Sequence, residues 1–147
     1  HLRSRWKHDR VKPTIDTNKV MKKIHVALAL IFSLNSTSAE LWTVSELNES
    51  ISKMDHDLVL LDVRTQAEYD SGHILNAINI SHDEILEDPE LLAGYKDSQM
   101  VVFCRSGIRA GKVIQLLESI GFEDIIDIDG DMLAWSEAGY RMEVNDE

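Results

Sequence analysis

The chain has 147 residues, of which 44% are apolar, and this is enough for one domain of ordinary size with a hydrophobic core. Its formal net charge of −11 is unevenly distributed, because residues 1–39 carry eight basic and two acidic side chains whereas residues 40–147 carry seven basic and 24 acidic ones. Such an acidic surface repels nucleic acid and anionic lipid, so we exclude both as partners. We expect a monomer, since no second apolar face is evident.

Residues 1–20 are basic and show no sustained apolar period, so we interpret them as an upstream extension that is not part of the fold. Residues 21–39 have the three parts of a secretory signal peptide: a positively charged start, an apolar run from Ile24 to Leu34 and a small polar tail that ends at Ala39. The apolar run has eleven residues, fewer than the ~20 that a membrane-spanning helix needs. A buried core helix is the alternative interpretation of this run.

The signal-peptide interpretation predicts cleavage after Ala39 and a mature bacterial protein that begins at Glu40. This protein is expected to be periplasmic or secreted, without membrane association after cleavage. Its folded domain is expected to span residues 40–147.

Short apolar strands alternate with helices from residue 41 onward. Strands are predicted at residues 41–42, 58–61, 77–80, 100–103 and 124–128. Capping-box patterns start helices after Thr43, Thr65 and Ser81, and Asp88-Pro89 starts a further helical turn. This alternation predicts an α/β fold with three layers, a mainly parallel sheet of about five strands with helices on both faces.

Two more helices complete the predicted fold. One follows the strand at 100–103, ends at Gly121 and is expected to bury Val113, Ile114, Leu117 and Ile120. Gly130 then ends the last strand, and a terminal helix over 132–138 directs Trp135 into the core.

Cys104 is the only cysteine of the chain, and it stands directly after the apolar strand at 100–103. Gly107 permits an unusual backbone turn three residues later, and a helical pattern follows at once. Backbone N–H groups and the positive end of a helix dipole therefore point at one sulfur atom, which favours the nucleophilic thiolate. The alternative interpretation of a lone cysteine is a small buried apolar residue.

A single cysteine excludes an intramolecular disulfide, and it leaves no partner thiol within the chain for an oxidised Cys104. Any sulfur or oxidation product at this site must pass to another molecule. His56, His73 and His82 lack ligand spacing and are interpreted as solvated or locally hydrogen-bonded. We expect neither a metal nor a cofactor.

The residues from Cys104 to Arg109 resemble the active-site loop of rhodanese-type sulfurtransferases. The resemblance extends, in order and with the spacing of a single rhodanese domain, over nearly all of residues 41–143. It includes the segments Leu60 to Arg64, Glu68-Tyr69, Gly72 to Ile74, Ala77 to Ile80, Gly130 to Trp135 and Ala138 to Tyr140.

This resemblance implies a rhodanese-like fold and a Cys104 nucleophile that takes the outer sulfur of thiosulfate or of another sulfane donor. The persulfide then passes its sulfur to cyanide or a thiol acceptor. The substrate-binding residues are expected to be Arg105, Ser106, Gly107, Ile108 and Arg109, acting mainly through their backbones.

Two positions depart from the family pattern: Ala110 replaces a frequent serine, and Asp131 replaces the second glycine of a common pair. We expect Asp131 to bring a carboxylate near the mouth of the site. Asp62 and Arg64 are interpreted as a structural pair, and His73 as a turn anchor rather than a base.

Two other functions fit parts of the same pattern. A cysteine-dependent phosphatase or arsenate reductase uses a similar loop, but its usual five residues between cysteine and arginine exceed the four between Cys104 and Arg109. The other is a non-catalytic rhodanese module that binds a partner or carries sulfur: the intact Cys104 argues against a module without chemistry, but a dedicated sulfur carrier would have the same sequence features.

Overall fold

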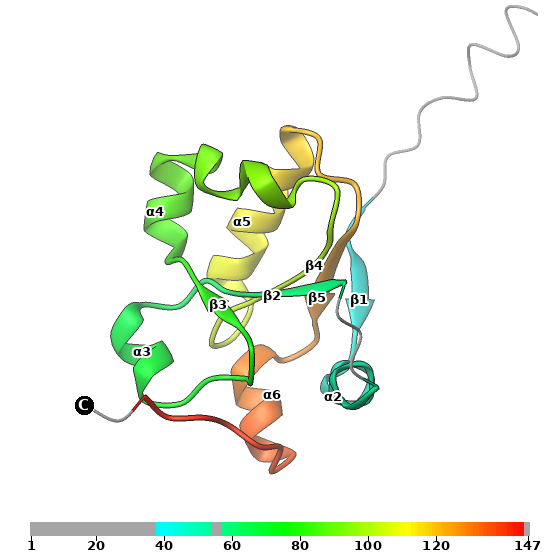
Figure 1. Ribbon diagram of the computed structural model, residues 1–147, viewed down its shortest axis with the longest axis vertical. Helices are drawn as coiled ribbons and strands as arrows, with labels where there is room; N and C mark the ends of the chain where they lie inside the picture. Colours follow the sequence, from blue (N-terminus) through cyan, green and yellow to red (C-terminus); the bar gives the residue numbers. More distant parts are fainter. Residues whose placement is uncertain (1–37, 54–56, 146–147) are drawn as a thin grey trace, which may run out of the picture. The chain divides into compact units, whose positions relative to one another are not determined.

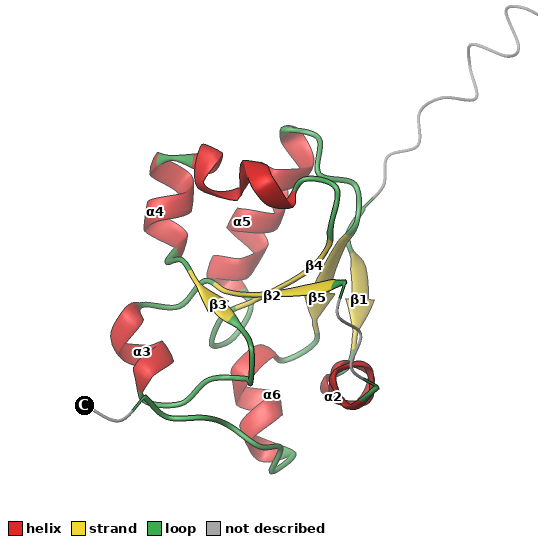
Figure 2. Ribbon diagram, in the orientation of Figure 1, coloured by secondary structure: helices red, strands yellow, loops and turns green. Residues whose placement is uncertain are grey.

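The computed structural model describes residues 38–53 and 57–145 (Figures 1 and 2). The extension at 1–20, nearly all of the predicted signal peptide and His56 lie outside these residues. Within the described part, five strands form one sheet in the order β1-β5-β4-β2-β3, and all neighbouring strands are parallel. The strands are β1 (Glu40–Trp42), β2 (Leu58–Asp62), β3 (Ile78–Asn79), β4 (Gln99–Phe103) and β5 (Ile125–Ile128).

The helices cover both faces of the sheet, as the sequence predicts. Helices α4 (His82–Glu87) and α5 (Ile108–Ser119) lie on one face, and α2 (Val44–Ser52) and α6 (Asp131–Glu137) lie on the other (Figure 1). The remaining helical segments are α3 (Gln66–Asp70) and the 3-10 helix η1 (Pro89–Tyr95). Within the described ranges we find no helix with both the length and the apolar character that a membrane crossing requires.

The three predicted capping boxes are confirmed. Thr43 and Thr65 each accept the backbone N–H of a glutamate three residues later, and that glutamate in turn accepts the N–H of the threonine. Ser81 donates both its N–H and its hydroxyl to Glu84 at 3.0 and 2.6 Å. These local bonds satisfy N–H groups that a helix start leaves without intrahelical partners.

The central strand β4 determines the direction of Cys104. Because successive strand residues face opposite sides of a sheet, Met100 and Val102 pack in the core beside α5, whereas Val101 and Phe103 pack in the core beside α6. Cys104 follows the same alternation as Met100 and Val102, and it is buried in the same core beside α5.

The predicted core is largely confirmed, including a buried Trp135. Ile120 is the exception: it was expected on the buried face of α5 but is 39% exposed. Helix α5 ends at Ser119 and Ile120 leaves the helical conformation at φ −103°, so its side chain no longer follows the helical period.

Candidate active site around Cys104

Cys104 lies at the carboxyl end of the central strand, where parallel sheets bind their ligands. Gly107 adopts φ +95°, a conformation that favours glycine, and its N–H donates to Cys104 Sγ at 3.1 Å. Helix α5 begins at the next residue, so the sulfur faces the positive end of this helix. The local structure therefore provides a hydrogen-bond donor and a favourable dipole for an anionic sulfur.

Three other predicted loop residues lie at the surface. Arg105, Ser106 and Ile108 are exposed, and Ile108 is 73% exposed. Arg105 also lines a pocket of about 260 Å³ beside the loop, together with residues of three other segments: Arg64, Glu68, Ser71, Gly72, Met132, Leu133, Ser136 and Met142. The pocket therefore lies next to the loop, and Cys104 is not among its lining residues.

Arg109 is paired across the site with Glu68 of α3. The Arg109 guanidinium donates two hydrogen bonds to the two carboxylate oxygens, at 2.7 and 2.8 Å. The hydrogen bond from Arg109 lowers the pKa of Glu68 to about 2, and the same bond raises the pKa of Arg109. Both side chains stay charged at neutral pH, and the pair fixes the loop to α3.

Glu68 is a site residue that the sequence places in a capping box and in a segment of the family resemblance, with no role at the cysteine loop. Its carboxylate also accepts the Thr65 N–H, so one side chain caps α3 and holds Arg109. The two residues are 41 positions apart, and no local pattern in the sequence signals this pairing.

Asp131 lies closer to Cys104 than the sequence suggests. Its side chain is 3% exposed, and its Oδ1 accepts the Cys104 backbone N–H at 2.6 Å. Burial raises the pKa of Asp131 to about 6, although hydrogen bonds from the Cys104 backbone and thiol act in the opposite direction. A buried carboxylate therefore stands directly behind the cysteine.

The first turn of α6 holds the backbone of the loop. The Met132 N–H donates to the Cys104 carbonyl, and the Leu133 N–H donates to the Arg105 carbonyl, both at 3.1 Å. These bonds tie the loop after β4 to the start of α6.

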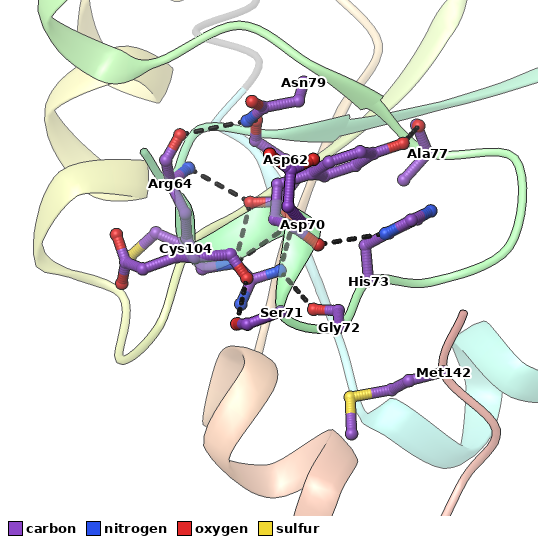
Figure 3. Close-up of polar contacts among 12 residues, drawn as sticks. Asp62, Arg64, Asp70, Ser71, Gly72, His73, Ala77, Asn79, Cys104 and Met142 are labelled. Atoms are coloured by element: carbon purple, nitrogen blue, oxygen red, sulfur yellow. Dashed lines mark hydrogen bonds and ion pairs between the residues drawn. The ribbon is translucent and has the colours of Figure 1, made fainter. Parts of the chain in front are cut away.

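Asp62 and Arg64 form the structural pair that the sequence predicts. The Arg64 guanidinium is directed at the Asp62 carboxylate, with a shortest distance of 2.6 Å, and at the Gly72 carbonyl at 2.9 Å (Figure 3). Asn79 donates to the backbone carbonyls of Asp62 and Arg64. This buried network joins β2, β3 and the turn after α3.

His73 anchors that turn. It is buried, its Nδ1 lies 3.0 Å from the Tyr69 carbonyl, and its ring stacks on Tyr69 with centroids 3.8 Å apart. The predicted role as a turn anchor is confirmed. In the part of the chain that the structure describes, we find no cluster of three or more His, Cys, Asp or Glu side chains able to hold a metal.

The described residues form an α/β protein with a five-stranded parallel sheet. Its candidate site is a buried cysteine at the carboxyl edge of that sheet, in a glycine-containing loop that begins a helix. Residues 43–138 match the rhodanese-like domain, and the chain belongs to this family. The predicted fold and family are thus confirmed.

Relatives of the chain include proteins named for different functions. It is 37% identical over 93 residues to "Putative sulfurtransferase YtwF" of Bacillus subtilis, covering 63% of this chain and 86% of that protein. It is 30% identical over 105 residues to a tRNA uridine(34) hydroxylase of Cronobacter sakazakii, covering 69% of this chain but only 30% of the hydroxylase.

Solved structures agree with the family assignment. A rhodanese-like domain protein from Staphylococcus aureus is 30% identical, with a TM-score of 0.62 over 73% of this chain and 99% of that one. A rhodanese-related protein from Thermoplasma volcanium is also 30% identical, with a TM-score of 0.62 over 71% of this chain and 98% of that one.

Proposed function

We propose that this chain is a sulfurtransferase that moves sulfane sulfur from thiosulfate to cyanide or a thiol acceptor through a persulfide on Cys104. The observation that carries this proposal is the hydrogen bond from the Gly107 N–H to Cys104 Sγ, in a loop that begins a helix. Similarity to YtwF supports sulfur transfer as the chemistry.

In the first step, the Cys104 thiolate attacks the outer sulfur of thiosulfate. A new S–S bond forms at Cys104, the S–S bond of thiosulfate breaks, and sulfite leaves with the bonding electron pair. The product is a Cys104 persulfide anion. The Gly107 N–H, which already donates to Sγ, and the N-terminal end of α5 favour this anion without reorganisation.

In the second step, cyanide or a thiolate attacks the outer sulfur of the persulfide. The S–S bond breaks, the Cys104 thiolate is the leaving group, and thiocyanate or a new persulfide departs. Because Cys104 is the only cysteine, the acceptor comes from outside the chain.

Arg105 is the loop arginine that we assign to recognition of the anionic donor. It is exposed at the pocket beside the loop, and it takes part in none of the ion pairs found among the described residues. Arg109, in contrast, is engaged by Glu68. We assign Ser106, Gly107 and Ile108 to the backbone cradle of the sulfur.

The test is to incubate the protein with thiosulfate and to measure its intact mass. A gain of one sulfur atom is expected in the wild type, with loss of that atom on addition of cyanide, and no gain is expected in Cys104→Ser. Turnover of an aryl phosphate without uptake of sulfur would replace the proposal with a phosphatase. Stable persulfide that only a particular protein discharges would identify a sulfur carrier.

We also propose that the protein is exported through the signal-like segment at residues 21–39. The check is the N-terminus of protein purified from its native host, which is expected to begin at Glu40. An N-terminus other than Glu40 would contradict this proposal.

A further inference from the structure

Another pocket lies on the face of the sheet that α2 and α6 cover (Figure 1). Its volume is about 470 Å³, which is in the range of pockets that bind small molecules, and ten described residues line it. None of these residues belongs to the cysteine loop or lines the pocket beside Arg105. The proposed sulfur transfer at Cys104 therefore does not account for this pocket.

The wall of this pocket is mainly apolar. Five lining residues belong to the core on this face of the sheet or pack against it: Ile51, Leu58, Leu60, Ile74 and Trp135. Leu75 extends the apolar surface toward solvent, since this residue is 37% exposed. Removal of such a surface from water favours binding of a ligand with an apolar body.

The charge of the lining residues differs from that of the rest of the domain. Residues 40–147 carry 24 acidic and seven basic side chains, yet none of the described lining residues is acidic, and Arg141 is the one among them that is charged. Arg141 is exposed and takes part in none of the ion pairs found among the described residues. An unpaired guanidinium beside an apolar wall favours a ligand with an anionic group, and its N–H donors match a carboxylate.

The backbone of Arg141 is held in place at the pocket. Trp135 Nε1–H donates to the Arg141 carbonyl at 3.1 Å, and the Trp135 and Tyr140 rings have centroids 5.0 Å apart. Two residues after Arg141, Glu143 and His73 exchange two backbone hydrogen bonds of 2.8 Å. The segment that carries Arg141 is thus fixed on both sides before a ligand binds, which lowers the entropy cost of binding.

A tight turn also contributes to the pocket. The Ala77 N–H donates to the Ile74 carbonyl at 3.0 Å, so Leu75 and Asn76 are the two central residues of this turn. Asn76 adopts φ +63°, in the left-handed region that asparagine enters more readily than most residues. Asn76 and Asn48 of α2 supply amide groups that can donate hydrogen bonds to a carboxylate.

We propose that this pocket binds a small carboxylate with an aromatic or aliphatic body. The anionic group pairs with Arg141, and the apolar body packs against Trp135 and the other core residues of the wall. Each of the two chemical parts of the ligand thus has its counterpart in the lining. The inference goes beyond the proposed sulfur transfer and requires no reaction at Cys104.

The first experiment titrates the isotopically labelled full chain with hydrocinnamate, a carboxylate with an aromatic body, and with octanoate, a carboxylate with an aliphatic body. Two-dimensional NMR follows the backbone signals of Leu75 and Asn76 and the indole N–H signal of Trp135. At least one of the two probes is expected to shift these signals to saturation and to leave the Gly107 signal unchanged. No saturable shift with either probe, or shifts confined to the cysteine loop, would overturn the proposal.

The second experiment tests the charge of the ligand. Hydrocinnamyl alcohol and hydrocinnamyl ammonium have the carbon skeleton of hydrocinnamate, but the first is neutral and the second is a cation. The dissociation constant of the alcohol is expected to be about fivefold higher than that of hydrocinnamate, and that of the ammonium compound higher still. Equal dissociation constants for the three compounds would refute the assignment to an anion.

The third experiment repeats the titrations with variants. Arg141→Gln is expected to raise the dissociation constant of hydrocinnamate about fivefold and to leave that of the alcohol unchanged, whereas Leu75→Ser is expected to weaken both. The matched control is Arg105→Gln, which removes an arginine that is also exposed and outside the ion pairs, and it is expected to change neither constant. Equal effects of the two arginine substitutions would show that hydrocinnamate responds to the net charge of the domain, and the proposal would be wrong.

A second copy of the chain is the other occupant that these signals can detect. If the Leu75, Asn76 and Trp135 signals shift when the protein is concentrated without a ligand, the pocket is a contact between copies and the proposal fails. None of these measurements depends on sulfur uptake, so failure of the proposed function would leave the test of this pocket unaffected.

Discussion

Glu68 and Arg109 join two segments that are 41 residues apart, through two hydrogen bonds of 2.7 and 2.8 Å. The guanidinium comes from the first turn of α5, directly after the Cys104 loop, and the carboxylate comes from the first turn of α3. The loop is thereby connected to the helix that borders its pocket.

Replacement of Glu68 by glutamine is expected to lower the free energy of unfolding at neutral pH by about 1 kcal/mol, because a charged, two-bond pair is lost at a partly exposed site. The pKa of Glu68 is lowered in the folded state to about 2. The Glu68 carboxylate therefore contributes fully to the free energy of unfolding at pH values above 4.5, its ordinary pKa. This contribution is lost as the pH falls through about 2. Urea unfolding at several pH values measures this.

The control is Glu84→Gln. Glu84 occupies the same position of a capping box, and its pKa is lowered by Ser81 rather than by an arginine. Since glutamine also serves in a capping box, Glu84→Gln is expected to have the smaller effect. If both variants lose the same free energy of unfolding, the ion pair between Glu68 and Arg109 does not contribute to stability.

Asp62→Asn is expected to lower the free energy of unfolding more than Glu68→Gln does. Asp62 is fully buried, and Arg64 is almost fully buried beside it. Asp62→Asn leaves the guanidinium without its counter-ion, which lowers the free energy of unfolding by about 3–5 kcal/mol. Urea unfolding of this variant is compared with Lys53→Met, which breaks the exposed pair with Glu49 and is expected to cost less than about 1 kcal/mol. Similar losses in both variants would refute the structural role of the buried pair.

Arg105→Gln is expected to weaken thiosulfate recognition and to leave the fold intact. An exposed positive charge that meets a dianion contributes about 1 kcal/mol, so the thiosulfate concentration for half-maximal loading is expected to rise about fivefold. The increase is expected to shrink at high salt, because the interaction is screened. Lys112→Gln, which removes an exposed charge from α5, is the control. An unchanged half-maximal concentration in Arg105→Gln would argue that the loop backbone alone binds the donor.

Most of the fold could be predicted from the sequence because its signals are local. Apolar strand runs, three capping boxes and the glycine after Cys104 each act within a few residues, and the structure confirms them. The helical period places Ile120 on the buried face, and it does not show that α5 already ends at Ser119.

The site could be predicted less completely because its charged contacts are tertiary. The Glu68 to Arg109 pair depends on how α3 and α5 sit at the sheet edge, which no local pattern encodes. The sequence shows that Asp131 replaces a glycine, but the inward direction of its carboxylate depends on its φ of +52° and on the bonds that tie α6 to the loop.

Gly107→Ala is expected to impair both the loop and the fold. The residue adopts φ +95°, and an added Cβ would lie 3.1 Å from Asp131 Oδ2, so the substitution costs at least about 1 kcal/mol of stability and displaces the N–H from Sγ. Gly111→Ala is the matched control, since Gly111 is in α5 with nothing within 4 Å of an added Cβ, and here alanine is expected to stabilise by about 0.4–1 kcal/mol. Unfolding and sulfur uptake are measured on both variants. If Gly107→Ala takes up sulfur at the wild-type rate, the N–H of Gly107 is not needed to hold the persulfide.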